Sequence, residues 1–214
     1  IKENAPNAKF YQASSSEMFG NSPGMKDENS VFKPRSPYGA AKVFAHQITN
    51  HYREAYNISA CCGILFNHES PLRGIEFVTR RITWNLARIK SKKIKNFTLG
   101  NIYAKRDWGF AGDYVESMWQ MLQQDKPDDY VVATGESHSV EEFLTLASEY
   151  AGLGDWHDFV KIDEFNIRPT DIDELTGDSS KARKKLGWKP KMEFNDLVKH
   201  MVYHDMDYFK NPTV

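Results

Sequence analysis

This chain of 214 residues has two cysteines, no long apolar run and almost no excess of charge of either sign. The two cysteines, Cys61 and Cys62, are adjacent within the apolar stretch 58–66, so no disulfide framework is expected and both are expected to be buried strand residues. The sequence has no apolar run of about 18 residues and no signal peptide. We therefore expect a cytoplasmic protein with no membrane partner.

The 28 basic and 29 acidic residues nearly cancel, which does not favour nucleic acid as a partner of the whole molecule. One segment is rich in cations, and it is interpreted as a solvated helix face: Arg80, Arg81, Arg88, Lys90, Lys92, Lys93 and Lys95. His200 and His204 have the i,i+4 spacing of metal ligands but lack the glutamate of an H-E-x-x-H motif. No metal site is predicted.

Short apolar runs alternate with helical periodicity along the chain. Strands are predicted at 10–14, 59–66 and 129–134, and helices at 37–57, 77–89, 113–122, 139–152, 179–186 and 194–209. Ser36, Asp113 and Ser139 are the expected caps, with a capping box at Ser139. The α/β alternation followed by helix-rich sequence predicts the fold class α/β: a partial Rossmann fold (doubly wound parallel sheet) with a smaller mixed α/β, helix-rich domain.

The most informative motif is Ser36-Pro37-Tyr38-Gly39-Ala40-Ala41-Lys42. Tyr38 and Lys42 are four positions apart just inside a predicted helix start, so they lie on one helix face. The lysine charge can stabilise the phenolate form of Tyr38, which lets the phenol act as a base near neutral pH. A single Tyr-x-x-x-Lys pair is often only structural, and that alternative stays open.

Upstream, the segment Phe10 to Glu17 is interpreted as a buried strand that ends in hydroxyls and a carboxylate. Ser15 and Glu17 therefore stand where an open α/β sheet places its ligand, at the carboxyl end of a strand. Glu17 has an alternative interpretation as a helix-capping carboxylate.

These motifs occur together with the segments 63–71 (GILFNHESP), 99–101 (LGN), 104–109 (AKRDWG), 113–130 and 168–170 (RPT). The combination resembles the extended short-chain dehydrogenase/reductase superfamily and, within it, the GDP-mannose 4,6-dehydratase family. The resemblance runs along nearly the whole chain.

The resemblance implies conversion of GDP-mannose to GDP-4-keto-6-deoxy-mannose and water, with transient reduction of NADP. Tyr38, helped by Lys42, would remove the C4 hydroxyl proton while hydride leaves C4. Ser15, where the family usually has Thr, would bond to the C4 oxygen. Glu17 would abstract the C5 proton and deliver a proton to the departing C6 hydroxyl.

Binding residues are carried over in the same way. Lys42, His68 and Arg73 match cofactor-binding positions. The candidates for binding the nucleotide sugar are Asn67, Leu99, Gly100, Asn101, Lys105, Arg106 and Arg168, of which the two arginines can bind diphosphate oxygens bidentately. Arg106 paired with Asp107, and Arg168 paired with Asp171 or Asp173, remain structural alternatives.

The family's glycine-rich G-x-x-G-x-x-G turn, which binds the dinucleotide pyrophosphate, is not in this sequence, and the sequence starts without Met. A fragment of a longer polypeptide is therefore expected. Residues 1–72 and 106–135 would form the C-terminal half of the Rossmann domain, and 73–105 and 136–214 a discontinuous nucleotide-sugar domain. The family resemblance also implies a homo-oligomer, a dimer or a tetramer.

Two other functions stay open. A related sugar-nucleotide epimerase would share Tyr38 and Lys42, but epimerisation at C4 needs no base at C5, so Glu17 favours the dehydratase. Alternatively, the chain is a non-catalytic nucleotide-sugar-binding remnant or a subunit that needs a complementing chain, with the 10–14 strand as an open edge.

Overall fold

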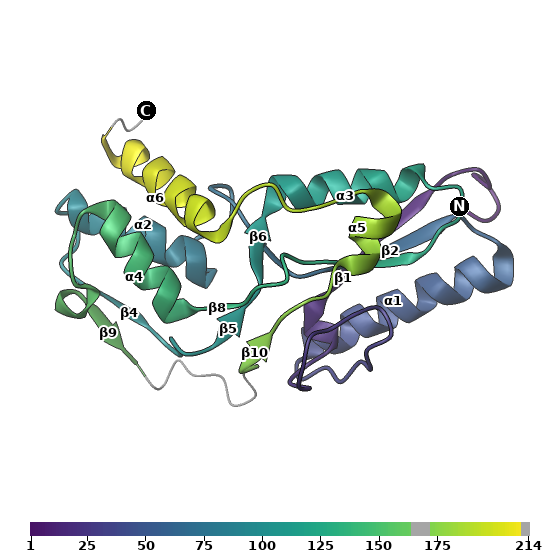
Figure 1. The fold of residues 1–214 in the computed structure, drawn as a ribbon, viewed down its shortest axis with the longest axis horizontal. Helices are drawn as coiled ribbons and strands as arrows, with labels where there is room; N and C mark the ends of the chain where they lie inside the picture. The colour runs from purple at the N-terminus through teal and green to yellow at the C-terminus, as the bar shows by residue number, and fades with distance from the viewer. Residues whose placement is uncertain (164–171, 211–214) are drawn as a thin grey trace.

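The computed structural model describes residues 1–163 and 172–210, which form two lobes side by side (Figure 1). The first lobe contains β1 (Phe10–Ser15), η1 (Ser16–Met18), α1 (Pro37–Tyr56), β2 (Ala60–Leu65), α3 (Ala111–Gln123), β7 (Asp129–Val132) and α5 (Ser180–Leu186). The second contains α2 (Val78–Lys90), β4 (Phe97–Leu99), α4 (Val140–Ala151), η2 (Trp156–Asp158), β9 (Val160–Ile162) and α6 (Phe194–Lys210). Short strands lie between them: β3 (Asn67–Glu69), β5 (Lys105–Arg106), β6 (Trp108–Phe110), β8 (His138–Ser139) and β10 (Glu174–Leu175).

A parallel sheet in the order β1-β2-β7 is the centre of the first lobe. The strand β2 is buried along its whole length, as its continuous apolar sequence requires. The helix α1 covers one face of the sheet, and α3 and α5 cover the other (Figure 1). This doubly covered parallel sheet confirms the predicted fold class, and Cys61 and Cys62 are buried free thiols as expected.

The second lobe is a helical layer over short strand pairs. The helices α2, α4 and α6 contribute Ile82, Leu86, Phe143, Leu144 and Met201 to one apolar cluster. The predicted inward residues of α6 are all buried: Leu197, Val198, Met201 and Val202. No helix among the described residues combines the length and apolar character needed to cross a membrane.

Local sequence signals fixed several helix ends as predicted. Ser36 caps α1, and Ser139 forms the reciprocal capping box of α4 with Glu142. Gly152 and Gly187 end α4 and α5 in the left-handed conformation that glycine adopts without strain.

Three expectations were wrong. The strand β1 is only half-buried over its first residues, because it lies at the edge of its sheet. Asp113 does not cap α3, which begins at Ala111; its carboxylate instead accepts hydrogen bonds from the backbone N–H groups of Lys191 (2.8 Å) and Met192 (3.1 Å). Arg80 is not on a solvated face but is buried against α6.

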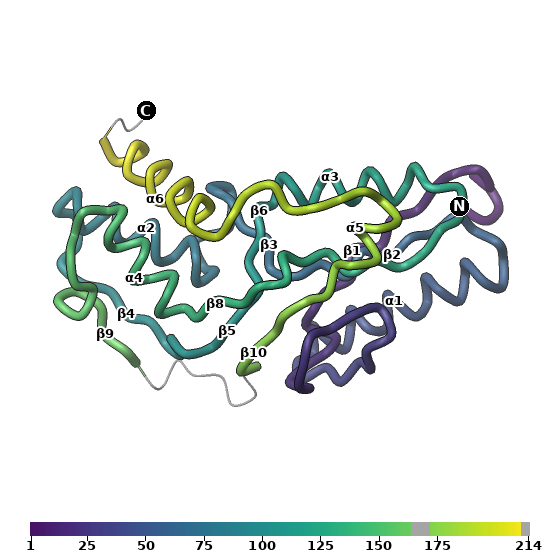
Figure 2. Tube along the Cα trace, viewed as in Figure 1, coloured from purple at the N-terminus to yellow at the C-terminus, as the bar shows by residue number. Residues whose placement is uncertain are grey.

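The chain crosses between the lobes more than once, and its path from β10 through α5 to α6 is clear in Figure 2. Asp107, which is fully buried, joins three of these crossing segments. Its carboxylate accepts hydrogen bonds from the backbone N–H groups of Thr134 (2.8 Å), Gly135 (2.9 Å) and Gly177 (3.2 Å). Burial raises the pKa of Asp107, while these hydrogen bonds oppose that rise.

Candidate active site

The first turn of α1 holds Tyr38 and Lys42 next to each other. The Ser36 side-chain oxygen accepts a hydrogen bond of 3.0 Å from the backbone N–H of Gly39, and Pro37 is the first helical residue. Lys42 Nζ lies 5.6 Å from the centre of the Tyr38 ring. Tyr38 is 55% exposed, so a ligand can reach it from solvent.

Two side chains fasten this helix to the carboxyl end of β1. Lys42 Nζ donates a hydrogen bond of 2.7 Å to the backbone carbonyl of Ala13. One turn further along, His46 Nδ1 and Ser14 Oγ form a buried hydrogen bond of 2.9 Å. The ammonium group is therefore held between the strand end and the tyrosine ring. Sequence motifs do not mark His46, and its i,i+4 spacing from Lys42 is its one signal, whereas Ser14 lies in the predicted strand end 10–17.

Ser15 and Glu17 lie where β1 ends. Ser15 caps η1, because its Oγ accepts a hydrogen bond of 3.2 Å from the backbone N–H of Glu17. The interpretation of Glu17 as the capping residue is therefore wrong. Its carboxylate forms no hydrogen bond or ion pair with any residue that the structure describes, so it is available to a ligand.

A close backbone approach joins the first turn of α1 to η1. A Cβ atom at Gly39 would lie 2.8 Å from the carbonyl oxygen of Glu17, which is too close for any residue with a side chain. Glycine thus allows the first turn of α1 to pack directly on η1. The structure thereby brings together Ser15, Glu17, Tyr38 and Lys42 at one edge of the sheet.

His68 and Arg73 follow the next strand. His68 Nδ1 lies 2.8 Å from the carbonyl of Phe66, its ring stacks on Tyr114 at 5.1 Å, and burial lowers its pKa. Arg73 places its guanidinium 3.6 Å from the centre of the Phe77 ring. Since β3 continues from β2, both side chains lie beyond the carboxyl end of the sheet.

Glu69 lies in the 63–71 segment but was not among the candidate site residues. It is 2% exposed, and its Oε2 accepts a hydrogen bond of 2.6 Å from Thr79 Oγ1. Arg73 Nε lies 3.3 Å from the same oxygen, an ion-pair contact that lacks the alignment of a hydrogen bond. Burial raises the pKa of Glu69 to about 6, and the Arg73 charge limits the rise.

The predicted sugar-nucleotide residues lie between the lobes and at the edge of the second. Asn67 pairs with Trp108 in the β3-β6 ladder, and Lys105 and Arg106 form β5 between β10 and β8. Arg106 Nη1 donates a hydrogen bond of 2.6 Å to the carbonyl of Ile172. Leu99 is buried at the end of β4, and Asn101 Oδ1 accepts a hydrogen bond of 3.0 Å from the backbone of Tyr103. Gly100 lies between them, and Arg168 is outside the described residues.

A polar cavity of about 580 Å³ borders this region. It is lined on one side by the segment 21–25, shortly after η1, and on the other by Gly135, Ser137, Asp173, Glu174 and Thr176. The backbone N–H of Lys105 donates to the carbonyl of Asp173 at 2.7 Å, which links the cavity wall to β5. A second cavity of about 330 Å³ is apolar and lies at the other end of the strands, beside Phe10 and Ala60.

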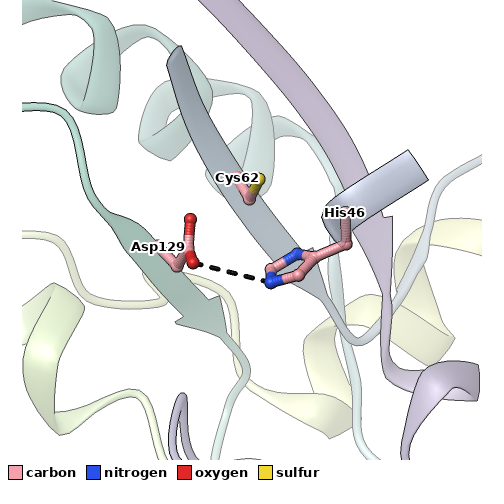
Figure 3. A group of neighbouring side chains, drawn as sticks. All are labelled: His46, Cys62 and Asp129. Atoms are coloured by element: carbon pink, nitrogen blue, oxygen red, sulfur yellow. Dashed lines mark ion pairs between the residues drawn. The ribbon is translucent and has the colours of Figure 1, made fainter. Parts of the chain in front are cut away.

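Within the described residues, one group of side chains has metal-ligand character: His46, Cys62 and Asp129, from three adjacent elements (Figure 3). Asp129 is already occupied, because Arg53 donates to both of its oxygens at 2.8 and 3.1 Å and His46 Nε2 is 3.5 Å away. Burial raises the pKa of the Cys62 thiol far above its usual range, which keeps it protonated. The group fits a hydrogen-bonded network that joins α1 to the sheet better than it fits a cation.

Comparison with known proteins identifies a family. A family model described as GDP-mannose 4,6 dehydratase matches residues 1–201. GDP-mannose 4,6 dehydratase 1 of Arabidopsis thaliana is 58% identical over 212 residues, which are 99% of this chain and 58% of that protein. The human GDP-mannose 4,6 dehydratase is 47% identical over 224 residues, with 95% of this chain and 60% of that protein covered. The chain thus spans somewhat more than half the length of these relatives.

Solved structures share the fold at low sequence identity. RMD from Pseudomonas aeruginosa, solved with NADPH, superposes with a TM-score of 0.84 at 18% identity and covers 94% of this chain and 67% of its own. The dTDP-glucose 4,6-dehydratase of Bacillus anthracis, solved with NAD, gives a TM-score of 0.85 at 19% identity, with coverages of 98% and 64%. At these identities the likeness supports the fold alone.

Proposed function

Since the chain belongs to the GDP-mannose 4,6-dehydratase family, we propose that it takes part in the conversion of GDP-mannose to GDP-4-keto-6-deoxy-mannose and water. The observation that carries the proposal is Glu17, whose carboxylate has no partner among the described residues and whose backbone packs against the first turn of α1, which carries Tyr38. Elimination of water requires a base beside the ring carbon next to the new ketone, and a free carboxylate can supply it.

The four residues at the strand end have distinct roles in this proposal. Tyr38 takes the proton of the C4 hydroxyl, and Lys42 stabilises the phenolate from one helical turn away. Ser15 holds the C4 oxygen. The new ketone acidifies the C5 proton, which Glu17 abstracts and then passes, as a proton, to the departing C6 hydroxyl. Tyr38 or solvent reprotonates C5.

The proposed cofactor is NADP, which when bound accepts a hydride from the sugar and later returns it. The residues present fit the nicotinamide end of such a dinucleotide. Lys42 is fixed at the strand end by the Ala13 carbonyl, and His68 keeps its Nε2 for a ligand because Nδ1 faces the Phe66 carbonyl. Arg73 supplies a cation from the following loop.

For the nucleotide sugar we propose Asn67, Leu99, Gly100, Asn101, Lys105, Arg106 and Arg168. The position of β5 supports this assignment, because Lys105 and Arg106 adjoin the wall of the polar cavity that begins near η1. Cationic side chains at that place can neutralise a diphosphate.

The remaining features stay proposals of the same kind. We propose the division into residues 1–72 with 106–135 and residues 73–105 with 136–214, except that α5 packs in the first lobe against β7 and α3, and we propose a cytoplasmic location. A homo-oligomer is supported by the apolar side chains that α1 exposes, among them Phe44 (70% exposed) and Ile48 (41%). Light scattering of the full-length protein tests for a dimer or tetramer.

Two substitutions in the full-length protein separate the proposed roles. Glu17→Gln should still reduce NADP on mixing with GDP-mannose but should form the dehydrated product about 100-fold more slowly or worse, because the base at C5 is lost. Tyr38→Phe should fail at the earlier step and show no reduction of NADP. Stopped-flow absorbance of the reduced nicotinamide and chromatography of the sugar nucleotides measure the two steps.

Glu54→Gln is the matched control, because Glu54 is exposed near the far end of α1 and should leave both steps unchanged. Normal dehydration by the Glu17→Gln variant would remove Glu17 from its role. Formation of a C4 epimer by the wild-type protein would favour the epimerase alternative.

A further inference from the structure

The loop 70–77, which carries Arg73, is hydrogen-bonded through its backbone to a buried arginine. Arg80 lies in the first turns of α2 and is 8% exposed. Its Nη1 donates hydrogen bonds to two backbone carbonyls of the loop, those of Pro71 and of Arg73, the latter at 3.2 Å. One guanidinium nitrogen thus binds the backbone on both sides of the loop's turn.

The other edge of the same guanidinium is bound to α6. Arg80 Nε lies 3.0 and 2.9 Å from the two oxygens of Asp205, and Nη2 lies 2.8 Å from one of them. Asp205 is fully buried and also accepts a hydrogen bond of 2.6 Å from Thr83 Oγ1. A planar guanidinium that is bound through one edge cannot rotate, so the contact with Asp205 orients Nη1 toward the loop carbonyls.

The Arg73 side chain is anchored separately, by Glu69. Arg73 Nε lies 3.3 Å from Glu69 Oε2, and the guanidinium stacks on the Phe77 ring. These two contacts hold the guanidinium in place. Backbone and side chain of Arg73 are therefore held by two different buried carboxylates, from β3 and from α6.

We propose that Asp205, acting through Arg80, is a positioning residue for Arg73 and so for binding of the nicotinamide dinucleotide. The inference rests on the proposed function for the identity of the ligand, but the anchoring of the loop does not. It assigns to the C-terminal helix a part in cofactor binding, although Asp205 is 125 residues from Arg80 in the sequence.

Stability alone does not account for this arrangement. A buried ion pair often contributes little net stability, because desolvation of the two charges offsets their attraction. Here the third nitrogen of the guanidinium donates to loop carbonyls rather than to Asp205, so the pair connects the loop to α6. Replacing the pair by apolar residues of similar volume should therefore preserve folding but release the loop.

The experiment uses the full-length protein with the double substitution Arg80→Met and Asp205→Leu, and a second variant, Arg80→Lys. The lysine keeps the positive charge, but its single ammonium cannot reach Asp205 and both carbonyls together. Asp207→Asn, on an exposed face of the same helix, is the matched control. Circular dichroism and thermal melting confirm folding of each variant.

Two readouts decide the question. Trypsin cleavage after Arg73 reports the freedom of the loop without reference to any ligand, and should become faster in both variants. Fluorescence titration with NADP should show weakening by about tenfold or more, since small misplacements of a binding group can cost up to a hundredfold. The value of kcat at saturating NADP should change much less.

Unchanged NADP affinity in a folded double variant would overturn the inference, whether or not the loop is cleaved faster. Faster cleavage with weaker NADP binding in both variants, and neither change in Asp207→Asn, would support it. Wild-type protein that binds NADP but does not dehydrate GDP-mannose would contradict the proposed function and leave this test intact.

Discussion

Glu69 is almost fully buried at the end of β3, and this burial gives it a titration unlike that of a surface carboxylate. Its pKa of about 6 in the folded protein is above the ordinary value of 4.5. The native state therefore binds the proton more tightly than the unfolded state. The resulting stabilisation is fully present below pH 4.5 and is lost as the pH rises through 6, a change of about 2 kcal/mol.

Glu69→Gln, which mimics the protonated carboxyl, should abolish this pH dependence. The free energy of unfolding of the variant, relative to wild type, should rise by about 2 kcal/mol between pH 4.5 and pH 7. Urea denaturation at several pH values measures the difference. The exposed Glu76→Gln is the control, and a difference that does not vary with pH would contradict the burial argument.

Two buried histidines change the stability of the protein with pH in the opposite direction to Glu69. Burial lowers the pKa values of His46 and His68, so the unfolded state takes up protons first and stability falls as the pH drops below 6.5. Comparison of Glu69→Gln with wild type cancels this background, because both proteins contain the two histidines.

Individual site residues were predicted from the sequence where a local motif contains them. Tyr38 and Lys42 are four residues apart, and the structure places them side by side. Glu69, His46 and Arg80 were missed or misassigned because their partners come from distant segments, and no periodicity within a helix reveals a contact with another element. Their binding roles, like those of the other site residues, stay predictions.

At the scale of single elements, the cap of α1 is the feature with the clearest functional consequence. Ser36→Ala should lower the free energy of unfolding by about 1 kcal/mol, because the backbone N–H of Gly39 loses its acceptor. Fraying of this turn should also reduce the rate of NADP reduction, since the turn carries Tyr38.

Ser139→Ala makes the same chemical change at the start of α4, where the Ser139 oxygen accepts a hydrogen bond of 3.0 Å from the backbone of Glu142. It should cost a similar free energy of unfolding, about 1 kcal/mol, and leave the NADP step unaffected. Chemical denaturation and single-turnover kinetics compare the two variants. Equal losses of activity would show that the cap acts only on global stability.

Element boundaries were predictable where caps and glycines act locally. The ends of α1 and α4 follow from Ser36, Ser139 and Gly152. The short strands β3, β5, β8 and β10 were not predicted, because two or three residues carry no periodic signal and their pairing depends on contacts made far along the chain.

At the scale of the whole molecule, Asp107 joins β5 and β6 to the segments after β7 and β10. Asp107→Asn should lower the free energy of unfolding by about 3 kcal/mol or more. The amide NH₂ group of asparagine cannot accept the hydrogen bonds that the backbone N–H groups donate to the carboxylate. Urea denaturation measures the loss. A loss below about 1 kcal/mol would contradict this role.

The architecture of the first lobe followed from the sequence, since a continuous apolar run next to an amphipathic helix predicts a covered parallel strand. The path of the C-terminal segment could not be predicted in the same way. It depends on a close approach at Gly177, where a Cβ would lie 2.4 Å from that of Ala133, and on the carboxylate of Asp107.

The contact of Gly39 with the Glu17 carbonyl has a consequence for how this protein can vary. Because main-chain atoms touch there, the spacing between the first turn of α1 and η1 has the tolerance of a single van der Waals contact. Surrounding loops can lengthen or change composition without altering that spacing, whereas one added methyl group at position 39 would widen it.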